Sequence, residues 1–279
     1  MIRTLLVIII FVFAGSVFAE DKEGGIIGTG VIGQITALDQ FEISGMQFDF
    51  APDIELKNLS SLEELRMGMT LAVSAGRDGE AWQIKELRHM PILTGPITGP
   101  EEVMGIPVIG KIPSMGTVQI DGFWSENGIV ATRVVEVEQD HVQVSGVYDG
   151  RDRINLVPIS GVSISGLVQG QNLTVSGKYR NGEVFVESAA QGPFMGDSPD
   201  LVLLEGYFHL QSASDSFSLH GVGSTSSTND TDIGIEQLVR RCSVNGRMDF
   251  LIGDLSQSDA EIVRSFCISA SNSTLLDDQ

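Results

Sequence analysis

The stretch Gly68-Met-Thr-Leu-Ala-Val-Ser-Ala-Gly-Arg-Asp-Gly79 decides the fold of this 279-residue chain, because the chain holds two further copies of it. These copies are Gly116-Thr-Val-Gln-Ile-Asp-Gly-Phe-Trp-Ser-Glu-Asn-Gly128 and Gly170-Gln-Asn-Leu-Thr-Val-Ser-Gly-Lys-Tyr-Arg-Asn-Gly182. Each copy alternates apolar and polar residues, as a strand does, and ends in Asp-Gly or Asn-Gly. Those dipeptides favour two-residue hairpin turns, since both turn positions need a positive φ. Each copy and the strand-like stretch after it therefore predict a β-hairpin.

A fourth, divergent copy is expected at Gly246–Gly253, with its second strand at Ala260–Ile268. An earlier pair of strands precedes each hairpin, except that the second copy is short and rich in proline. The sequence therefore predicts repeats in this order: 27–94, 95–140 (shortened), 141–193 and 200–270 (divergent).

The predicted fold class is all-β, made of tandem small OB-like antiparallel β-barrel or hairpin repeats. One or two short helical turns are expected, at Leu62–Met67 and Ile235–Arg241. Repeats this small bury too little surface to be stable alone, so neighbouring repeats should pack on each other.

The first repeat resembles a known bacterial family. The residues that carry the resemblance are Gly28-Thr-Gly-Val-Ile-Gly-Gln-Ile-Thr36, Ile43-Ser-Gly-Met-Gln-Phe-Asp49 and Gly68-Met-Thr-Leu-Ala-Val73. They are similar to the repeats called domain of unknown function 5666, and the third repeat is less similar. The resemblance implies an exported bacterial protein with β-barrel repeats, and it implies no activity and no site residues.

The N-terminus has the pattern of a secretory signal peptide over residues 1–19. Arg3 precedes the apolar run Leu5–Phe13, and Val17-Phe18-Ala19 places small residues before a cleavage point. The alternative is an uncleaved anchor helix, but the run is shorter than the ~20 residues that a membrane span needs. We therefore expect an exported protein, periplasmic or secreted, with no membrane insertion after cleavage. Residues 271–279 are expected to be a disordered tail.

The charge of the chain limits the classes of partner that it can bind, and its two cysteines indicate the redox state of its compartment. The formal net charge is −20, so phosphate backbones are repelled and nucleic acid is not expected as a partner. Cys242 and Cys267 are the only cysteines, and in an oxidising compartment they favour one disulfide. The alternative is a pair of free buried thiols.

Neither a cofactor nor a metal is expected. Gly28, Gly30 and Gly33 have the spacing of a dinucleotide fingerprint, but that site needs a buried strand before the glycines and a helix after them. Strand-like residues follow instead. His209 and His220 could meet across a hairpin, but without a third ligand they make a poor metal site.

No catalytic motif stands out, so we expect a non-enzymatic protein. The first hypothesis is a binding module that recognises a protein or a glycan through the faces of its barrels. Trp124 and Tyr179, each just before a turn, would form an exposed partner-binding edge. The alternative is that the two rings cap barrel cores, as is favoured for Trp82. Two other functions remain open: a structural spacer or assembly component, and a hydrolase with an unrecognised acidic site.

Overall fold

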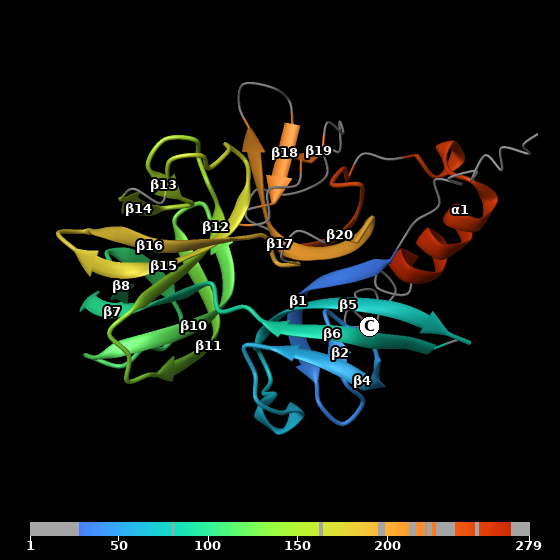
Figure 1. Cartoon of the computed structure of the whole chain (residues 1–279), viewed down its shortest axis with the longest axis horizontal. Coiled ribbons are helices and arrows are strands. Elements are labelled where there is room, and N and C mark those ends of the chain that lie inside the picture. The colour runs from blue at the N-terminus through green and yellow to red at the C-terminus, as the bar shows by residue number, and fades with distance from the viewer. Residues whose placement is uncertain are drawn as a thin grey trace, which may run out of the picture.

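A computed structural model describes residues 28–79, 81–161, 164–194, 199–211, 216–219, 221, 225–226, 238–248 and 251–268. Within these ranges the chain is all-β, as predicted, and its strands form two sheets of ten strands each (Figure 1). The expected signal peptide and C-terminal tail lie outside the described residues. No helix in the described part of the chain has the length and apolar character needed to cross a membrane.

The N-terminal strands form a closed barrel, called barrel 1 here. Its strands are β1 (Thr29–Ala37), β2 (Glu42–Ile43), β3 (Met46–Gln47), β4 (Asp49–Lys57), β5 (Thr70–Asp78) and β6 (Ala81–His89), with the 3-10 turn η1 (Leu62–Glu64) between β4 and β5. Strand β5 is antiparallel to β1 and β6, β4 runs parallel to β6, and β2 and β3 lead from β1 back to β4. This is the connectivity of an OB-type barrel.

Two further barrels repeat that connectivity. Barrel 2 contains β7 (Leu93–Gly99), β8 (Glu102–Val103), β9 (Ile106–Ile109), β10 (Thr117–Ser125) and β11 (Gly128–Glu136). Barrel 3 contains β12 (Val142–Val147), β13 (Arg153–Ile154), β14 (Val157–Ser160), β15 (Asn172–Arg180) and β16 (Glu183–Gln191). The parallel pairs are β9–β11 and β14–β16. The proline-rich second repeat thus forms a complete strand ring.

The three predicted hairpins are confirmed as β5–β6, β10–β11 and β15–β16. The three have the same strand lengths and the same pairing register. Every one of their strands has nine residues. Each hairpin has a β-bulge after the fifth residue of its first strand, which leaves one residue of the second strand unpaired. The unpaired residues are Lys85, Thr132 and Glu187. This alignment allows any position in one barrel to be compared with its equivalents.

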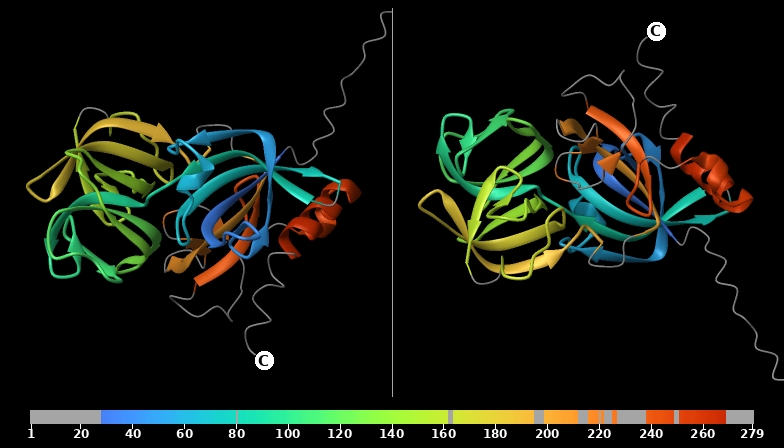
Figure 2. Two further views of the ribbon diagram at one scale, coloured as in Figure 1. Left: turned by 90° about the horizontal axis from the view of Figure 1, so that it is seen from below. Right: turned by 90° about the horizontal axis from the view of Figure 1, so that it is seen from above.

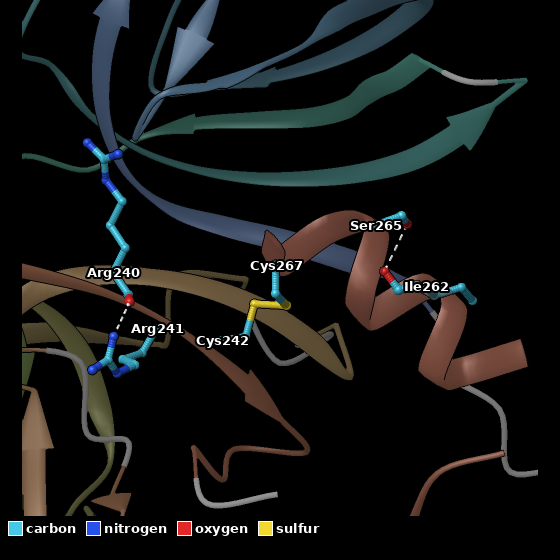
Figure 3. Close-up of a disulfide and its surroundings, with 6 residues drawn as sticks. All are labelled: Arg240, Arg241, Cys242, Ile262, Ser265 and Cys267. Carbon is cyan, nitrogen blue, oxygen red and sulfur yellow. Dashed lines mark hydrogen bonds between the residues drawn. A yellow bond between two sulfur atoms is a disulfide. The ribbon is translucent and has the colours of Figure 1, made fainter. Parts of the chain in front are cut away.

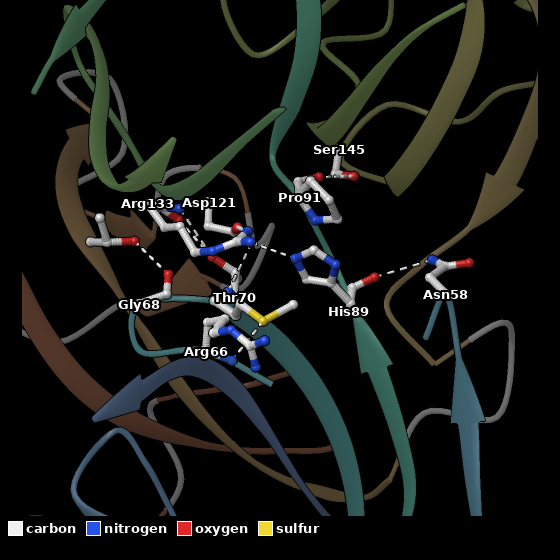
Figure 4. Close-up of polar contacts among 12 residues, drawn as sticks. Asn58, Arg66, Gly68, Thr70, His89, Pro91, Asp121, Arg133 and Ser145 are labelled. Atoms are coloured by element: carbon white, nitrogen blue, oxygen red, sulfur yellow. Dashed lines mark hydrogen bonds and ion pairs between the residues drawn. The ribbon is translucent and has the colours of Figure 1, made fainter. Parts of the chain in front are cut away.

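Barrels 2 and 3 lie side by side and share one sheet through the antiparallel pair β7–β12 (Figure 2). Barrel 1 is joined to barrel 2 through Asp121 on β10, which is fully buried. Its Oδ1 accepts a hydrogen bond from the Thr70 backbone N–H (3.0 Å) and lies 2.8 Å from His89 Nε2 (Figure 4). Its Oδ2 accepts from Arg133 Nη1 at 3.0 Å. The carboxylate therefore ties two strands of barrel 1 to the hairpin of barrel 2.

The segment predicted as the fourth repeat, 200–270, shares a sheet with barrel 1, and within the described residues its strands repeat only part of the barrel connectivity. Strand β17 (Leu201–Gln211) pairs in parallel with β1 and antiparallel with β20 (Leu238–Val244), so both extend the sheet of barrel 1. The short strands β18 (Ser216–Leu219) and β19 (Thr225–Ser226) complete that sheet. Residues 201–204 are apolar without alternation because both faces of β17 are buried. Leu201 and Leu203 face the core of barrel 1, and Val202 and Leu204 face a second cluster.

Two local predictions in this segment are wrong. The helical turn expected at Ile235–Arg241 is strand β20 from Leu238 onward, and residues 235–237 are not described. The strand expected at Ala260–Ile268 is helical: α1 (Gln257–Val263) and η4 (Arg264–Ile268) follow the 3-10 turn η3 (Ile252–Asp254). The Ser256 side chain caps α1 by accepting from the Asp259 backbone N–H. The buried residues Ala260, Val263 and Phe266 recur every three positions, which fits one face of a helix.

The predicted disulfide is confirmed between Cys242 on β20 and Cys267 in η4, with 6.0 Å between the two Cα atoms (Figure 3). It fastens the C-terminal helical segment to the sheet of barrel 1. Next to Cys267, Phe266 is fully buried in the core of barrel 1. The disulfide thus secures part of that core.

Replacing both cysteines with Ser is expected to lower the free energy of unfolding by about 3.5 kcal/mol, because the bond closes a loop with a sequence separation of 25. Urea unfolding followed by circular dichroism measures this. Unfolding of the wild type in excess reductant is the matched control and should show the same loss. An unchanged unfolding midpoint in both experiments would contradict a stabilising disulfide.

Candidate functional site

The glycine pattern at Gly28, Gly30 and Gly33 has a packing explanation. A Cβ atom on Gly30 would lie 2.8 Å from Phe194 Cζ and 2.9 Å from Pro199 Cγ. A Cβ on Gly33 would collide with Ser44 Oγ, which donates to the buried Glu205 carboxylate at 2.7 Å. Strand β1 lies between β5 and β17, and Gly30 and Gly33 let neighbouring side chains pass close to its backbone. Gly28, just before the strand, instead has a positive φ of 82°.

The weak metal candidates His209 and His220 are residues whose side chains the structure does not describe. His220 lies outside the described residues, and of His209 only the backbone in β17 is described. In the part of the chain that the structure describes, no group of three or more His, Cys, Asp or Glu side chains could hold a metal ion.

Trp124 does not lie on an exposed edge, so this part of the sequence prediction is wrong. Its side chain is only 2% exposed, and its Nε1–H donates to the Ser145 carbonyl oxygen at 2.7 Å. The bulge adds its residue to β11, so the alternation along β10 is unbroken. Trp124 therefore points to the same side as the core residues Val118 and Ile120.

Tyr179 occupies the equivalent place in barrel 3 and also faces inward. Its cross-strand partner is the core residue Val184, and its ring is half-buried against the shared core of barrels 2 and 3. Burial raises the pKa of its hydroxyl above the ordinary value of 10.0. Trp124 and Tyr179 thus hold equivalent positions near the hairpin ends of their respective barrels.

Barrel 1 lacks this aromatic. The equivalent residue is Arg77, which is exposed and pairs across the hairpin with Trp82. Trp82 in turn holds the place of Ile129 and Val184, which are fully buried in their barrels. With an exposed arginine in place of that ring, the hairpin end of barrel 1 is open.

A groove of about 630 Å³ lies at this open end. Its residues come from the first strands of the barrel, from the hairpin and from the C-terminal segment: Glu42, Gly45, Met46, Gln47, Phe48, Asp49, Arg77, Ala81, Trp82 and Ser265. A groove of this volume is within the range of small-ligand sites, about 300–1,000 Å³.

Trp82 forms a partly exposed aromatic wall of the groove. Its ring contacts the buried ring of Phe266 edge-on, with 4.7 Å between the ring centres. The expectation that Trp82 belongs to the core is therefore half right, since one part of the ring packs inward and another lines the groove. Phe266 fixes the orientation of the ring, and the adjacent disulfide holds Phe266 in place.

Polar groups of both charges surround this aromatic wall. Arg77 lines the groove, and its Nε–H donates to the Gly79 carbonyl oxygen at 3.0 Å. In the described part of the chain, Glu42 and Asp49 pair with no cation. With Gln47 they provide carboxylate and amide groups beside an indole, an arrangement that suits a ligand with an apolar face and many hydroxyl groups.

Comparison with known proteins finds no matching family model, curated protein or solved structure. The resemblance of the first repeat to an exported bacterial family therefore stays a prediction.

Sequence reasoning missed Arg77 as a site residue. The sequence has no clear signal for it, because aligning the closing Asp-Gly or Asn-Gly dipeptides puts Arg77, Trp124 and Tyr179 in three different columns. Only the strand pairing makes the three residues equivalent. A charged residue at a position where two repeats have aromatics indicates that the side chain at this position does not pack inward in the first repeat. The other groove residues come from segments far apart in the sequence, so no local sequence pattern predicts that they meet.

Proposed function

We propose that this chain is an exported, non-enzymatic glycan-binding module whose ligand occupies the groove at the open end of barrel 1. The observation that carries the proposal is the exposed Arg77 at the position where barrels 2 and 3 have an aromatic, with Trp82 beside an open groove. The groove lies at the β2–β3 strands and the end of the β5–β6 hairpin. OB-type barrels bind oligonucleotides and oligosaccharides on this kind of surface.

The charges of the chain favour a sugar over a nucleic acid. The formal net charge is −20, and the groove itself contains Glu42 and Asp49. A phosphate backbone would be repelled by both. A neutral oligosaccharide has no such cost, can stack a ring face on Trp82 and can offer hydroxyl groups to the carboxylates and to Gln47.

Calorimetric titration with soluble hexose and N-acetylhexosamine oligosaccharides tests this proposal. At least one series is expected to bind, and Trp82→Ala is expected to weaken that binding by about tenfold or more, because an anchor aromatic typically contributes about 2 kcal/mol. Gln47→Ala, at an exposed site, should weaken it by a smaller factor. Arg180→Ala is the matched control, since Arg180 is an exposed arginine at the hairpin end of barrel 3.

Two outcomes would contradict the proposal. One is that no oligosaccharide binds. The other is that Trp82→Ala and Gln47→Ala bind as the wild type does while their unfolding midpoints are unchanged.

A further inference from the structure

A second cavity lies between barrel 1 and barrel 3 and shares no residue with the groove. It is a cleft of about 230 Å³. Asn58, Arg88 and His89 form its barrel 1 side, and Gln143, Ser176 and Ser188 are among the barrel 3 residues that face them. No Asp or Glu lines this cleft, although the chain has 37 acidic residues against 17 Lys and Arg.

The Arg88 guanidinium has fewer hydrogen-bond and ion-pair partners than it has N–H donors. Its side chain is 11% exposed, and within the described residues its one ion pair joins Nη2 to Glu86 Oε1 at the long distance of 3.5 Å. Its Nε is buried with no hydrogen-bond partner in the described structure. A guanidinium has five N–H donors, and a buried charge that is poorly paired is costly. An anion in the cleft would offset that cost.

The opposite wall is a polar patch on the outer face of barrel 3. Gln143 pairs with Ser176 across β12–β15, and Ser176 pairs with Ser188 across β15–β16, so the three side chains lie on one face. None of the three forms a side-chain hydrogen bond within the described residues. They are free to bind hydroxyl groups of a ligand.

The repeat alignment shows which group is missing from the cleft. Ser176 holds the position in barrel 3 that Asp121 holds in barrel 2. Asp121 contacts Thr70 and His89 of barrel 1 through its carboxylate and closes that interface. Barrel 3 brings a hydroxyl to barrel 1 where barrel 2 brings a carboxylate, and Arg88, the neighbour of His89, lines the space that remains.

We propose that this cleft is a second binding site, which takes a carboxylate on a small hydroxylated molecule such as a single uronic acid unit. The carboxylate binds the Arg88 guanidinium, which presents parallel N–H donors to its two oxygens. The ring hydroxyls bind Gln143, Ser176 and Ser188. The cleft is smaller than the usual site for a drug-sized ligand, about 300 Å³ or more, so it suits one sugar unit.

Titration of the full chain with D-glucuronate, D-glucose and inorganic phosphate, observed by ligand NMR, tests the site. Glucuronate is expected to bind at least tenfold more tightly than glucose, which lacks the carboxylate, and more tightly than phosphate, which lacks the hydroxyls. Arg88→Gln is expected to weaken glucuronate binding by at least tenfold, and Arg88→Lys should restore only part of it because an ammonium lacks the planar fork.

Ser176→Asp gives a sharper variant, because it places in barrel 3 the carboxylate that barrel 2 has at Asp121. It should abolish glucuronate binding while the unfolding midpoint in urea stays at or above that of the wild type. Arg180→Gln, outside the cleft, and Trp82→Ala, in the groove, should both leave glucuronate binding unchanged. The Trp82 variant thereby separates this site from the proposed glycan groove.

The proposal is overturned if glucose or phosphate binds as tightly as glucuronate, or if glucuronate does not bind. It is also overturned if Arg88→Gln and Ser176→Asp, both folded, bind glucuronate as the wild type does.

Discussion

Replacing Asp121 with Ala is expected to lower the free energy of unfolding by about 3–5 kcal/mol, the usual cost of removing one partner from a buried ion pair. Asp121 is fully buried and accepts hydrogen bonds from the Thr70 backbone N–H and from Arg133. His89, itself 5% exposed, lies against the same carboxylate. The Ala variant leaves these groups without their acceptor at the junction between barrels 1 and 2. Urea unfolding of the whole chain measures the loss.

The repeats provide the control for this experiment. Ser176 is the equivalent residue in barrel 3 and has no hydrogen bond from its side chain within the described residues, so Ser176→Ala should change stability by less than about 0.5 kcal/mol. Asp121→Asn keeps the shape but loses the charge, so it should fall between the two. A loss below about 1 kcal/mol for Asp121→Ala would show that the carboxylate does not join the barrels.

Replacing Trp124 with Ala is expected to lower the free energy of unfolding by about 3–5 kcal/mol, because the ring is buried in the shared core of barrels 2 and 3. The change also leaves the Ser145 carbonyl oxygen without the Nε1–H donor that it accepts at 2.7 Å. Trp124→Phe retains much of the packing and should lose less.

Tyr179→Ala is the matched comparison, since Tyr179 holds the same position in barrel 3 but is only half-buried. It should cost less than Trp124→Ala in the same urea experiment. If Trp124→Ala left stability unchanged, the exposed binding edge expected from the sequence would be restored as an explanation for the two aromatics.

The repeated hairpins could be predicted from the sequence because their information is local. Alternation of apolar residues and a nearby Asp-Gly or Asn-Gly dipeptide predict two strands and a tight turn within about a dozen residues. The dipeptide fills both turn positions only at Asn181-Gly182, and in the other two hairpins the turn is shifted by one residue. The C-terminal segment could not be predicted in this way. Its strand β17 pairs with β1, far away in the sequence, and Ser256 in a turn-like context serves as a helix cap.

The candidate site depends on strand register and on contacts between segments that are far apart in the sequence. The position of the bulge decides which side of the hairpin each residue faces, and the unbroken alternation from Val118 through Ile120 to Trp124 already predicts a buried ring. The groove residues, in contrast, meet through the closure of barrel 1 and the docking of Ser265 and Phe266 from the C-terminal segment. Neither contact has a signature in the local sequence.

Arg77→Tyr tests most directly whether the open end of barrel 1 is a binding groove. The variant gives barrel 1 the residue that barrel 3 has at Tyr179, at an inward-facing position paired with Trp82. Calorimetry with the oligosaccharide that binds the wild type should show affinity lowered by at least about tenfold, as for the loss of an anchor contact, with an unchanged or higher unfolding midpoint. Wild-type affinity in a folded Arg77→Tyr variant would contradict a ligand site at this end of barrel 1.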